Sequence, residues 1–381
     1  SPKPKACPYN DLPMDRRKFL VRTGQAALLL GFSPASLLGQ SAPDIASTYR
    51  DSIVIDALCS PVSRDDVPPA SSDLQQARQS GITAVNCTVS GRNFNDTVKN
   101  IAFAQWLAEQ HPDIWLLVRR HSDIARAKRE RKTGIILGFQ FTEPFENDLS
   151  LLETFRGLGV RIIQMSYNNR GLLGDGCLEP GNAGLSKRGK DAVARMNQLG
   201  IAVDLSHCGQ QTTADGIASS NQPVLITHSG CNAVHRHPRN KDDRELRALA
   251  DRGGVIGVYF MPYLCASPQV PSREIVLQHL AHALQVCGED HVGIGSDNSV
   301  QAVELTEDQR KRFLDDMANR KRVGIAAPEE DRLPYVPDLN GPRKLETLAA
   351  GLAQRGYGSS AITKVLGGNF HRVLGEIWGT A

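Results

Sequence analysis

Three side chains with catalytic potential each follow a short apolar run in the sequence. His207 ends A-V-D-L-S-H, His228 ends V-L-I-T-H, and Asp297 ends V-G-I-G-S-D. Imidazole suits zinc, and a carboxylate opposite it can take and return the proton that amide hydrolysis needs. A single histidine at a strand end is more often a hydrogen-bonded structural residue, so the inference depends on all three side chains. Together they indicate a metal-assisted hydrolytic site.

Arg239 is a candidate contact for a substrate. It lies eleven residues after His228, in the loop H235-R-H-P-R-N240. A guanidinium can bind a substrate carboxylate through two parallel hydrogen bonds, and a surface ion pair is the alternative that the spacing leaves open. His235 and His237 share this loop but sit beside an arginine and a proline, so we expect both on the surface.

The chain from residue 51 onward repeats one theme, which predicts the frame that positions these side chains. Each unit has a short β-branched run, a turn with a polar residue or glycine, and a helical pattern. Runs this apolar are typical of parallel strands that helices cover on both faces. Eight such units match a single (β/α)8 barrel, which needs about 250 residues. The eight expected strands are residues 53–56, 82–87, 135–140, 161–166, 201–206, 224–227, 254–259 and 291–296.

An open sheet of similar order is the alternative architecture. No G-x-G-x-x-G follows any expected strand, so a dinucleotide-binding version is unsupported. Active sites of (β/α)8 barrels lie at the C-terminal ends of the strands, and neighbouring strands are only about 4.8 Å apart. Gln140 after the third strand and Tyr167 after the fourth therefore belong to the same ring as His207, His228 and Asp297.

Two stretches fit no unit, namely the glycine-rich Asn168–Gly184 and Glu304–Pro342, which combines a charged helix with a proline-rich tail. We expect both to pass over one end of the barrel.

The basic run at residues 126–132 is most simply the solvated face of a helix, and a last helical region is expected at residues 343–378. The other expected helices are residues 96–110, 149–157, 186–199, 242–252 and 272–287.

The composition of the 381 residues is that of an ordinary globular protein, with 40% hydrophobic and 22% charged residues. The net charge of +3 and the lack of a long run of like charges give no reason to expect nucleic acid or an anionic membrane as a partner. Eight scattered cysteines without a C-x-x-C pair argue against a disulfide framework or a zinc knuckle. The cysteines do not indicate in which cellular compartment the protein works.

The N-terminal residues resemble a twin-arginine export signal. D15-R-R-K-F-L20 precedes the apolar A26-A-L-L-L-G-F32 and a stretch of small residues. We therefore expect translation to start at Met14, residues 1–42 to comprise an upstream extension and the signal, and residues 43–381 to form a single barrel domain. The protein would be periplasmic, having crossed the membrane already folded, and soluble or peripherally associated with the membrane, because no segment reaches the ~18 apolar residues of a membrane span. An amphipathic first helix is the alternative.

Further motifs, taken in order, resemble the membrane dipeptidase family, also called renal dipeptidases or peptidase family M19. The resemblance covers nearly everything from residue 51 to the C-terminus. Members of this family are (β/α)8 metallohydrolases that cleave dipeptides with two zinc ions bridged by a hydroxide. The motifs are G184-L-S-K-R-G189, M196-N-Q-L-G-I-A-V-D-L-S-H207, T227-H-S-G230, H237-P-R-N240, G253-G-V-I-G-V258, H291-V-G-I-G-S-D297 and G367-G-N-F-H-R-V373.

The resemblance implies a role for four residues of the predicted ring and loop. His207 and His228 would bind the second zinc ion, Arg239 would bind the substrate carboxylate, and Asp297 would be the acid and base. The resemblance also implies a small peptide or dipeptide-like substrate. Dimers are usual in the family, so a homodimer is expected by analogy.

Four positions depart from the family pattern. Leu58 and Ser60 stand where the first strand of the family carries the H-x-D that binds the first zinc ion. Gln140 stands for a glutamate that bridges both ions, and Tyr167 stands for a histidine that steadies the oxyanion. A leucine cannot coordinate zinc, a serine is a poor ligand, and glutamine offers only a neutral carbonyl. Two zinc ions need anionic ligands, so we expect one zinc ion at most.

Cys59 and Glu143 are the nearest replacement ligands, but neither is expected at the site. Side chains alternate along a strand, so Cys59 should point away from the face of Leu58 and Ser60. Glu143 would need a displacement of three residues to replace Gln140. The changed positions are consistent with one another, because Gln140 and a tyrosine at position 167 can hydrogen-bond a histidine or a ligand in place of a metal.

Two functions of different classes fit these residues. The first is a hydrolase of dipeptides or related amides that uses one metal ion at His207 and His228, with Asp297 as general acid and base. Its substrate-binding residues would be Arg239, Tyr167 and Gln140. The second is a metal-free binding or maturation factor in the periplasmic processing of a peptide natural product, as for the dipeptidase-like factor of pyoverdine siderophore maturation. A third hypothesis uses Tyr167 or a pocket cysteine as the reactive group.

Overall fold

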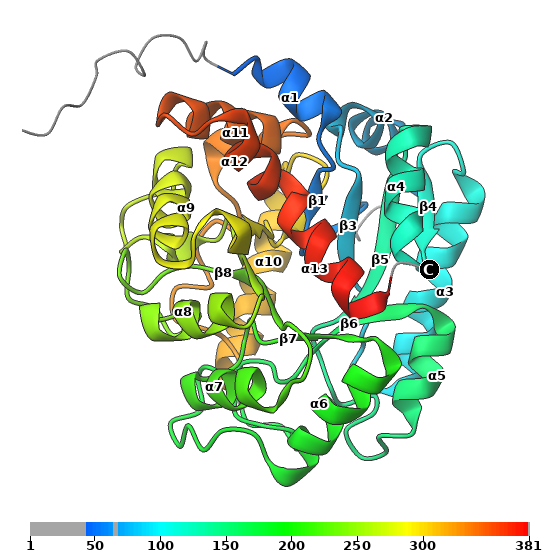
Figure 1. Cartoon of the computed structure of the whole chain (residues 1–381), viewed down its shortest axis with the longest axis vertical. Helices are drawn as coiled ribbons and strands as arrows, with labels where there is room; N and C mark the ends of the chain where they lie inside the picture. Colours follow the sequence, from blue (N-terminus) through cyan, green and yellow to red (C-terminus); the bar gives the residue numbers. More distant parts are fainter. Residues whose placement is uncertain (1–42, 64–67, 380–381) are drawn as a thin grey trace, which may run out of the picture. The chain divides into compact units, whose positions relative to one another are not determined.

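The computed structural model describes residues 43–63 and 68–379, so the predicted export signal lies outside the described residues. Within these ranges, the main sheet has nine parallel strands that alternate with helices along the chain (Figure 1). Eight of them close into a barrel, because β3 pairs with β1 on one side and with β5 on the other. The predicted (β/α)8 barrel is confirmed. Its strands are β1 (Ile55–Asp56), β3 (Ala84–Thr88), β5 (Thr133–Phe139), β6 (Val160–Gln164), β7 (Ala202–Asp204), β8 (Leu225–Ser229), β9 (Val255–Val258) and β10 (Val292–Ile294).

Helices follow the barrel strands and cover the barrel. They are α1 (Ile45–Asp51), α2 (Ser71–Ser80), α3 (Phe94–Gln110), α4 (His121–Glu130), α5 (Leu151–Leu158), α6 (Lys187–Leu199), α7 (Gln210–Ser219), α8 (Asp243–Asp251), α9 (Arg273–Cys287), α10 (Glu307–Arg322), α11 (Lys344–Gln354), α12 (Ser359–Thr363) and α13 (Asn369–Trp378). The Ser186 hydroxyl accepts a hydrogen bond from an N–H of the first turn of α6, and Asp242 forms a capping box with Glu245 at the start of α8. No helix within residues 43–63 and 68–379 is long and apolar enough to cross a membrane.

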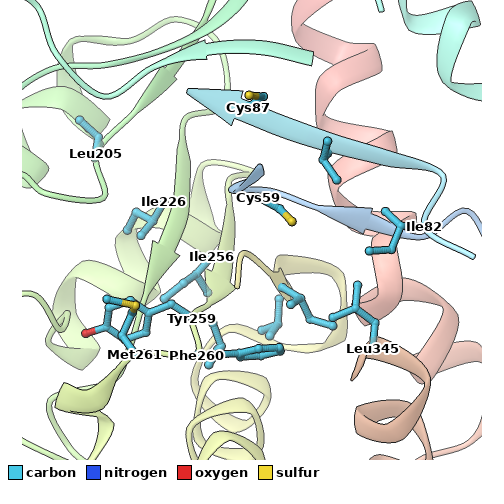
Figure 2. Close-up of a cluster of buried hydrophobic side chains, with 14 of the residues drawn as sticks. Cys59, Ile82, Cys87, Leu205, Ile226, Ile256, Tyr259, Phe260, Met261 and Leu345 are labelled. Carbon is cyan, nitrogen blue, oxygen red and sulfur yellow. The ribbon is translucent and has the colours of Figure 1, made fainter. Parts of the chain in front are cut away.

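The last helix closes one end of the barrel. Ala202, Leu225 and Val255 are the first residues of β7, β8 and β9, and they share a buried cluster with the apolar face of α13, which runs across the strands in Figure 1. The next residues along β8 and β9, Ile226 and Ile256, point the other way into a second cluster, part of which Figure 2 shows. Since α13 covers the N-terminal strand ends, the C-terminal ends form the open mouth.

The strand predictions missed three short strands. β4 (Trp115–Val118) pairs with the first half of β5, and β2 (Cys59–Ser60) pairs with β11 (Asn298–Ser299). Runs of two to four residues are too short to show a period, which is why the sequence pattern did not reveal them. The β2–β11 pair matters for the site, because it holds the backbone after β1 beside the backbone after β10.

Both predicted excursions lie at the C-terminal mouth and touch each other. The Asn168 side-chain amide donates a hydrogen bond to the carbonyl of Ile325 over 2.8 Å. The neighbouring Asn169 amide donates to the carbonyl of Gly324 over 2.9 Å. The loop after β6 is therefore fastened to the segment that follows α10.

Candidate functional site

Four of the predicted site residues contact one another at the C-terminal mouth. Nε2 of Gln140 lies 3.2 Å from Nε2 of His228, and the ring of Tyr167 stacks on the ring of His207 with 4.2 Å between centroids. Asp297 lines a cavity of about 380 Å³ in this mouth, and Gln140 lines the same cavity. The barrel thus brings together residues that lie far apart in the sequence.

The two histidines face each other through their ring nitrogens. Nε2 of His207 lies 2.9 Å from Nε2 of His228, and both side chains are buried. The second nitrogen of each ring, Nδ1, contacts a neighbouring polar side chain. Those neighbours decide which ring nitrogen carries the proton.

Asn168 determines the position of the proton on His207. Its amide nitrogen donates to the carbonyl of Ile325, which leaves its oxygen Oδ1 facing Nδ1 of His207 at 2.7 Å. The thiol of Cys177 donates to the same oxygen over 3.5 Å. An amide oxygen only accepts hydrogen bonds, so Nδ1 of His207 carries the proton. Nε2 of the neutral ring then has a free electron pair.

Thr227 and Asp204 determine the position of the proton on His228. Oγ1 of Thr227 donates to Oδ2 of Asp204 over 2.6 Å and lies 2.8 Å from Nδ1 of His228. The only proton of the hydroxyl is engaged by the carboxylate, so Nδ1 of His228 donates to Thr227. Nε2 of His228 then carries no proton when the ring is neutral, and its electron pair faces both Gln140 and His207.

With both protons on Nδ1, the two Nε2 electron pairs face each other at 2.9 Å, where they repel unless a proton or a metal ion lies between them. Burial and the positive charge of Arg239 hold the pKa of His207 and of His228 well below the usual range, so both rings are neutral near neutral pH. A neutral imidazole whose Nδ1–H is held by a hydrogen bond is the form in which histidine binds a metal. Two nitrogens bound to a tetrahedral zinc ion lie about 3.3 Å apart, so a small opening of the pair would admit one ion.

Gln140 supplies a donor where a metal centre would need an anion. Its Nε2 donates to Nε2 of His228, and its Oε1 accepts a hydrogen bond from Thr88 over 3.0 Å. Within the described ranges, no group of three or more histidine, cysteine, aspartate or glutamate side chains is arranged to hold a metal ion. The residues present fit one weakly held ion at the two histidines and do not fit a pair of ions.

The other half of the mouth is a cavity with mostly neutral walls. Leu58 and Ser60 both line it, and the leucine is only 5% exposed. Cys59 is buried at the same wall, and burial raises the pKa of its thiol well above the usual range, so it is not a thiolate. Glu143 instead forms an ion pair with Arg92 at 2.6 Å, with both side chains exposed. Neither replacement supplies an anionic ligand.

Asp297 is held beside this cavity by the backbone. Its φ of +59° lies in the left-handed region, which aspartate adopts more readily than most residues, and its N–H donates to the carbonyl of Leu58 over 2.8 Å. Burial raises the pKa of the carboxyl to about 7, although the positive charge of Arg239 opposes this shift. A carboxyl with such a pKa can both give and take a proton at neutral pH.

Arg239 is fully buried, so the surface ion pair that its spacing left open is wrong. Its Nη1 donates to the carbonyl of Ser206 over 2.6 Å, and its Nη2 donates to the carbonyl of His228 over 3.3 Å. Its Nε is buried without a hydrogen-bond partner. The guanidinium therefore joins the two turns that carry the histidines and leaves its buried Nε–H without a partner.

His237 is buried as well, which corrects the expectation that it lies on the surface. Its ring stacks on Tyr263 at 4.5 Å between centroids, and its Nε2 donates to the carbonyl of Pro328 over 3.0 Å. The arginine and proline beside it suggested solvent, but the loop after β8 lies under the residues that follow α10. Burial lowers the pKa of His237 to about 4, so the ring is neutral.

Tyr167 covers His207 and is itself tied to the segment after β10. Its hydroxyl accepts a hydrogen bond from Arg320 over 3.3 Å, and Arg320 pairs with Glu330 at 2.7 Å. Burial raises the pKa of the phenol, so Tyr167 is neutral and is a poor nucleophile. Its position suits hydrogen bonding and stacking.

Sequence reasoning gave no role to three residues that orient the histidines. Asn168, Asp204 and Thr227 are polar residues at the ends of apolar runs, and that polarity was the available signal. Their contacts with the ring nitrogens depend on side-chain directions that a one-dimensional pattern does not contain.

Comparison with known proteins identifies relatives of this fold and sequence. The family model described as membrane dipeptidase (peptidase family M19) matches residues 69–321. Dipeptidase tcpJ of Claviceps purpurea is 28% identical over 288 residues, or 75% of this chain, and dipeptidase verJ of Clonostachys rogersoniana is 29% identical over 283 residues, or 74% of this chain. The chain spans only 60% and 65% of the lengths of these two relatives.

Two solved structures have the same fold. The crystal structure of an amidohydrolase from Pseudomonas aeruginosa is 33% identical, with a TM-score of 0.78 over 88% of this chain and 99% of that one. A metallopeptidase from Rhodobacter sphaeroides, solved with a phosphinate mimic of the dipeptide L-Ala-D-Ala, has a TM-score of 0.70 at 20% identity and covers 86% of this chain and 100% of its own. At that identity the second match concerns the fold alone.

Proposed function

Because this chain belongs to the membrane dipeptidase family, we propose that it hydrolyses a dipeptide or a related small amide at the mouth of its barrel, with one zinc ion at most. The observation that carries the proposal is the orientation of His207 and His228. Both Nδ1 atoms donate to neighbours, so the two Nε2 electron pairs face each other at 2.9 Å, and that of His228 also accepts a hydrogen bond from Gln140. Such a donor pair fits one zinc ion, whereas Leu58 and Ser60 fit none.

Asp297 is the proposed general acid and base. A pKa of about 7 means that both protonation states are populated at neutral pH. The ionised carboxylate can accept a proton from an attacking water, and the protonated carboxyl can deliver one to the leaving amine. The side chain lines the same cavity as Gln140, so a substrate there would lie between the two.

The other site residues are proposed to bind and orient the substrate. The unpartnered buried Nε of Arg239 supports a contact with a substrate carboxylate, because a buried cation gains from an anionic partner. Gln140 and Tyr167 can hydrogen-bond the amide or stack against a side chain. A zinc ion held by the two histidines would polarise the substrate carbonyl.

Zinc binding and turnover test this proposal together. The exported chain is stripped with a chelator, titrated with zinc by calorimetry and assayed against a dipeptide panel by mass spectrometry. We expect His207→Ala and His228→Ala to lose zinc, and Asp297→Asn to keep zinc while losing turnover by about 100-fold or more. His235→Ala is the matched control outside the site. Wild-type protein that neither binds zinc nor cleaves a dipeptide would contradict the proposal.

A metal-free maturation factor for a periplasmic peptide natural product, such as a siderophore, is the second candidate function. It is favoured by Gln140, whose amide already donates to Nε2 of His228 and thereby satisfies one metal-binding atom without a metal. Binding of a peptide natural product by zinc-free protein, with no dipeptide cleavage, would support this candidate over the hydrolase.

We also propose a cellular location for the protein and an oligomeric state. We expect the twin-arginine segment to direct the chain to the periplasm, and Arg16→Lys with Arg17→Lys to retain it in the cytoplasm, as cell fractionation would show.

A homodimer is expected by analogy with the family, and light scattering measures the mass directly. A monomer at working concentration would contradict the dimer without affecting the site.

A further inference from the structure

The residues after β6 are fastened to a segment that is remote in the sequence. Asn168 and Asn169 donate to the carbonyls of Ile325 and Gly324, respectively, over 2.8 and 2.9 Å. We call residues 320–330, which contain these two carbonyls, the cap. Asn168, one of the two asparagines that donate to these carbonyls, also contacts His207.

The cap has anchors of its own. Arg320 and Glu330 form an ion pair at 2.7 Å with side chains only 14% and 13% exposed. The second carboxylate oxygen of Glu330 accepts from the N–H of Ala327 over 2.9 Å, and the carbonyl of Pro328 accepts from His237 over 3.0 Å. Two of these contacts lie within the cap, and the contact of Pro328 with His237 joins the cap to the loop after β8 in addition to the contact with Asn168.

The Asn168 amide satisfies its neighbours in only one orientation. A rotated amide would place Oδ1 against the carbonyl oxygen of Ile325, where two acceptors would repel each other at 2.8 Å. The same rotation would remove from Oδ1 the hydrogen bonds of Cys177 and His207. The cap carbonyl thus decides which end of the amide faces the histidine.

We propose that Asn168 is a positioning residue that holds His207 with its proton on Nδ1, and that the Ile325 carbonyl of the cap sets the orientation of Asn168. The cap then controls whether His207 presents a free Nε2 to a metal ion or a ligand. The position of the proton on His207 can be measured whether or not the protein turns over a substrate. The consequence for zinc binding rests on the proposed function.

Nitrogen NMR of the full chain labelled with ¹⁵N-histidine tests the tautomer, because protonated and unprotonated ring nitrogens have widely separated chemical shifts. The His207→Ala variant assigns the signal. We expect the wild type to show Nδ1–H for His207 and Asn168→Leu to show a mixture of tautomers. Asn169→Leu is the matched control, since it loses a cap contact but no contact with the histidine, and it should keep the wild-type signal. Nε2–H in the wild type, or an unchanged signal in Asn168→Leu, would overturn the proposal.

Two further variants separate the two contacts of Asn168. Asn168→Asp keeps an acceptor for Nδ1 of His207 but cannot donate to Ile325, so we expect the tautomer to persist while amide hydrogen exchange in the cap accelerates. Glu330→Ala removes the contacts with Arg320 and Ala327 inside the cap and should give mixed tautomers at His207. An unchanged tautomer in Glu330→Ala, with faster exchange proving that the cap is loose, would overturn control by the cap. Circular dichroism verifies that each variant is folded.

Zinc affinity provides the functional readout. Loss of a hydrogen bond to a ligating histidine weakens metal binding on the order of 10- to 100-fold, so Asn168→Leu should show this loss and Asn169→Leu should not. Equal affinities in the two variants would overturn the link between Asn168 and zinc binding. If the wild type binds no zinc, the metal part of the proposed function fails, while the NMR signal of His207 still decides the role of Asn168.

Discussion

The two halves of the barrel mouth hold their side chains in different ways. After β7 and on β8, His207 and His228 each have Nδ1 engaged by a polar side chain, and their Nε2 atoms meet. After β1, Leu58 and Ser60 line a cavity, and the order there comes from backbone pairing between β2 and β11. One half is organised by side-chain hydrogen bonds, and the other half is organised by the backbone.

This difference bears on which positions of the mouth can change at little cost. Positions 58 and 60 can change without disturbing the β2–β11 pairing, because that pairing uses only main-chain groups. Replacement of either histidine would leave Asn168 or Thr227 with a lost hydrogen bond in a buried setting, which costs about 1–3 kcal/mol per group. The physical cost of change therefore falls on the histidine half.

The largest effect on stability is expected from a substitution of Asp204, which hydrogen-bonds the residues that precede the two histidines. Asp204 accepts hydrogen bonds from the N–H and hydroxyl groups of both Ser206 and Thr227. Asp204→Ala leaves these buried donors without a partner, so the free energy of unfolding should fall by about 3 kcal/mol. Ser60→Ala in the other half should change it by less than about 0.5 kcal/mol. Urea denaturation compares the variants, and equal losses would mean that the two halves are not held differently.

A smaller effect is expected from making the histidine half more like a metal site. Gln140→Glu removes the donor that faces Nε2 of His228 and supplies a negative charge, so zinc affinity should rise on the order of tenfold, or about 1.4 kcal/mol. Gln140→Leu is the control, because it removes the donor without adding charge and should give a smaller gain. Calorimetry measures both, and equal affinities in wild type and Gln140→Glu would show that the missing anion does not limit binding.

A further effect is expected in the half of the mouth that contains Asp297, whose contribution to stability depends on pH. The pKa of Asp297 is about 7 in the folded protein and 3.8 in its unperturbed state. Between these values the unfolded chain has lost a proton that the folded chain retains, so stability falls as the pH rises from about 4 to about 7. Asp297→Asn cannot ionise, so its melting temperature relative to wild type should increase by about 2–4 °C between pH 4.5 and pH 8. A constant difference across this range would contradict the raised pKa.

Much of the fold follows from the sequence because its barrel strands are apolar runs between polar turns. The runs around Ile135–Ile136 and Ile162–Ile163 are buried on both faces and show the parallel-strand pattern clearly. The positions of His207, His228 and Asp297 follow from their places at strand ends. β4, β2 and β11 did not, because strands this short have no readable period.

The detailed site could not be predicted, because its decisive contacts join residues that are remote in the sequence. Asn168 and Ile325 are 157 residues apart, and no local pattern links an amide after one strand to a carbonyl in an excursion after another. The burial of His237 has the same cause, since its ring contacts Pro328, which is 91 residues further along the chain. The neighbouring arginine and proline favoured an exposed His237, and the spacing left a surface ion pair open for Arg239, but both side chains are buried.

The zinc content of three proteins tests most directly the claim that only the histidine half can hold an ion. Wild type, His207→Ala with His228→Ala, and Leu58→Ala with Ser60→Ala are dialysed against buffered zinc and analysed by elemental mass spectrometry per chain. The account predicts one ion in the wild type, one in the Leu58 and Ser60 variant, and none in the histidine variant. Two ions in the wild type, or an ion that survives the loss of both histidines, would contradict it.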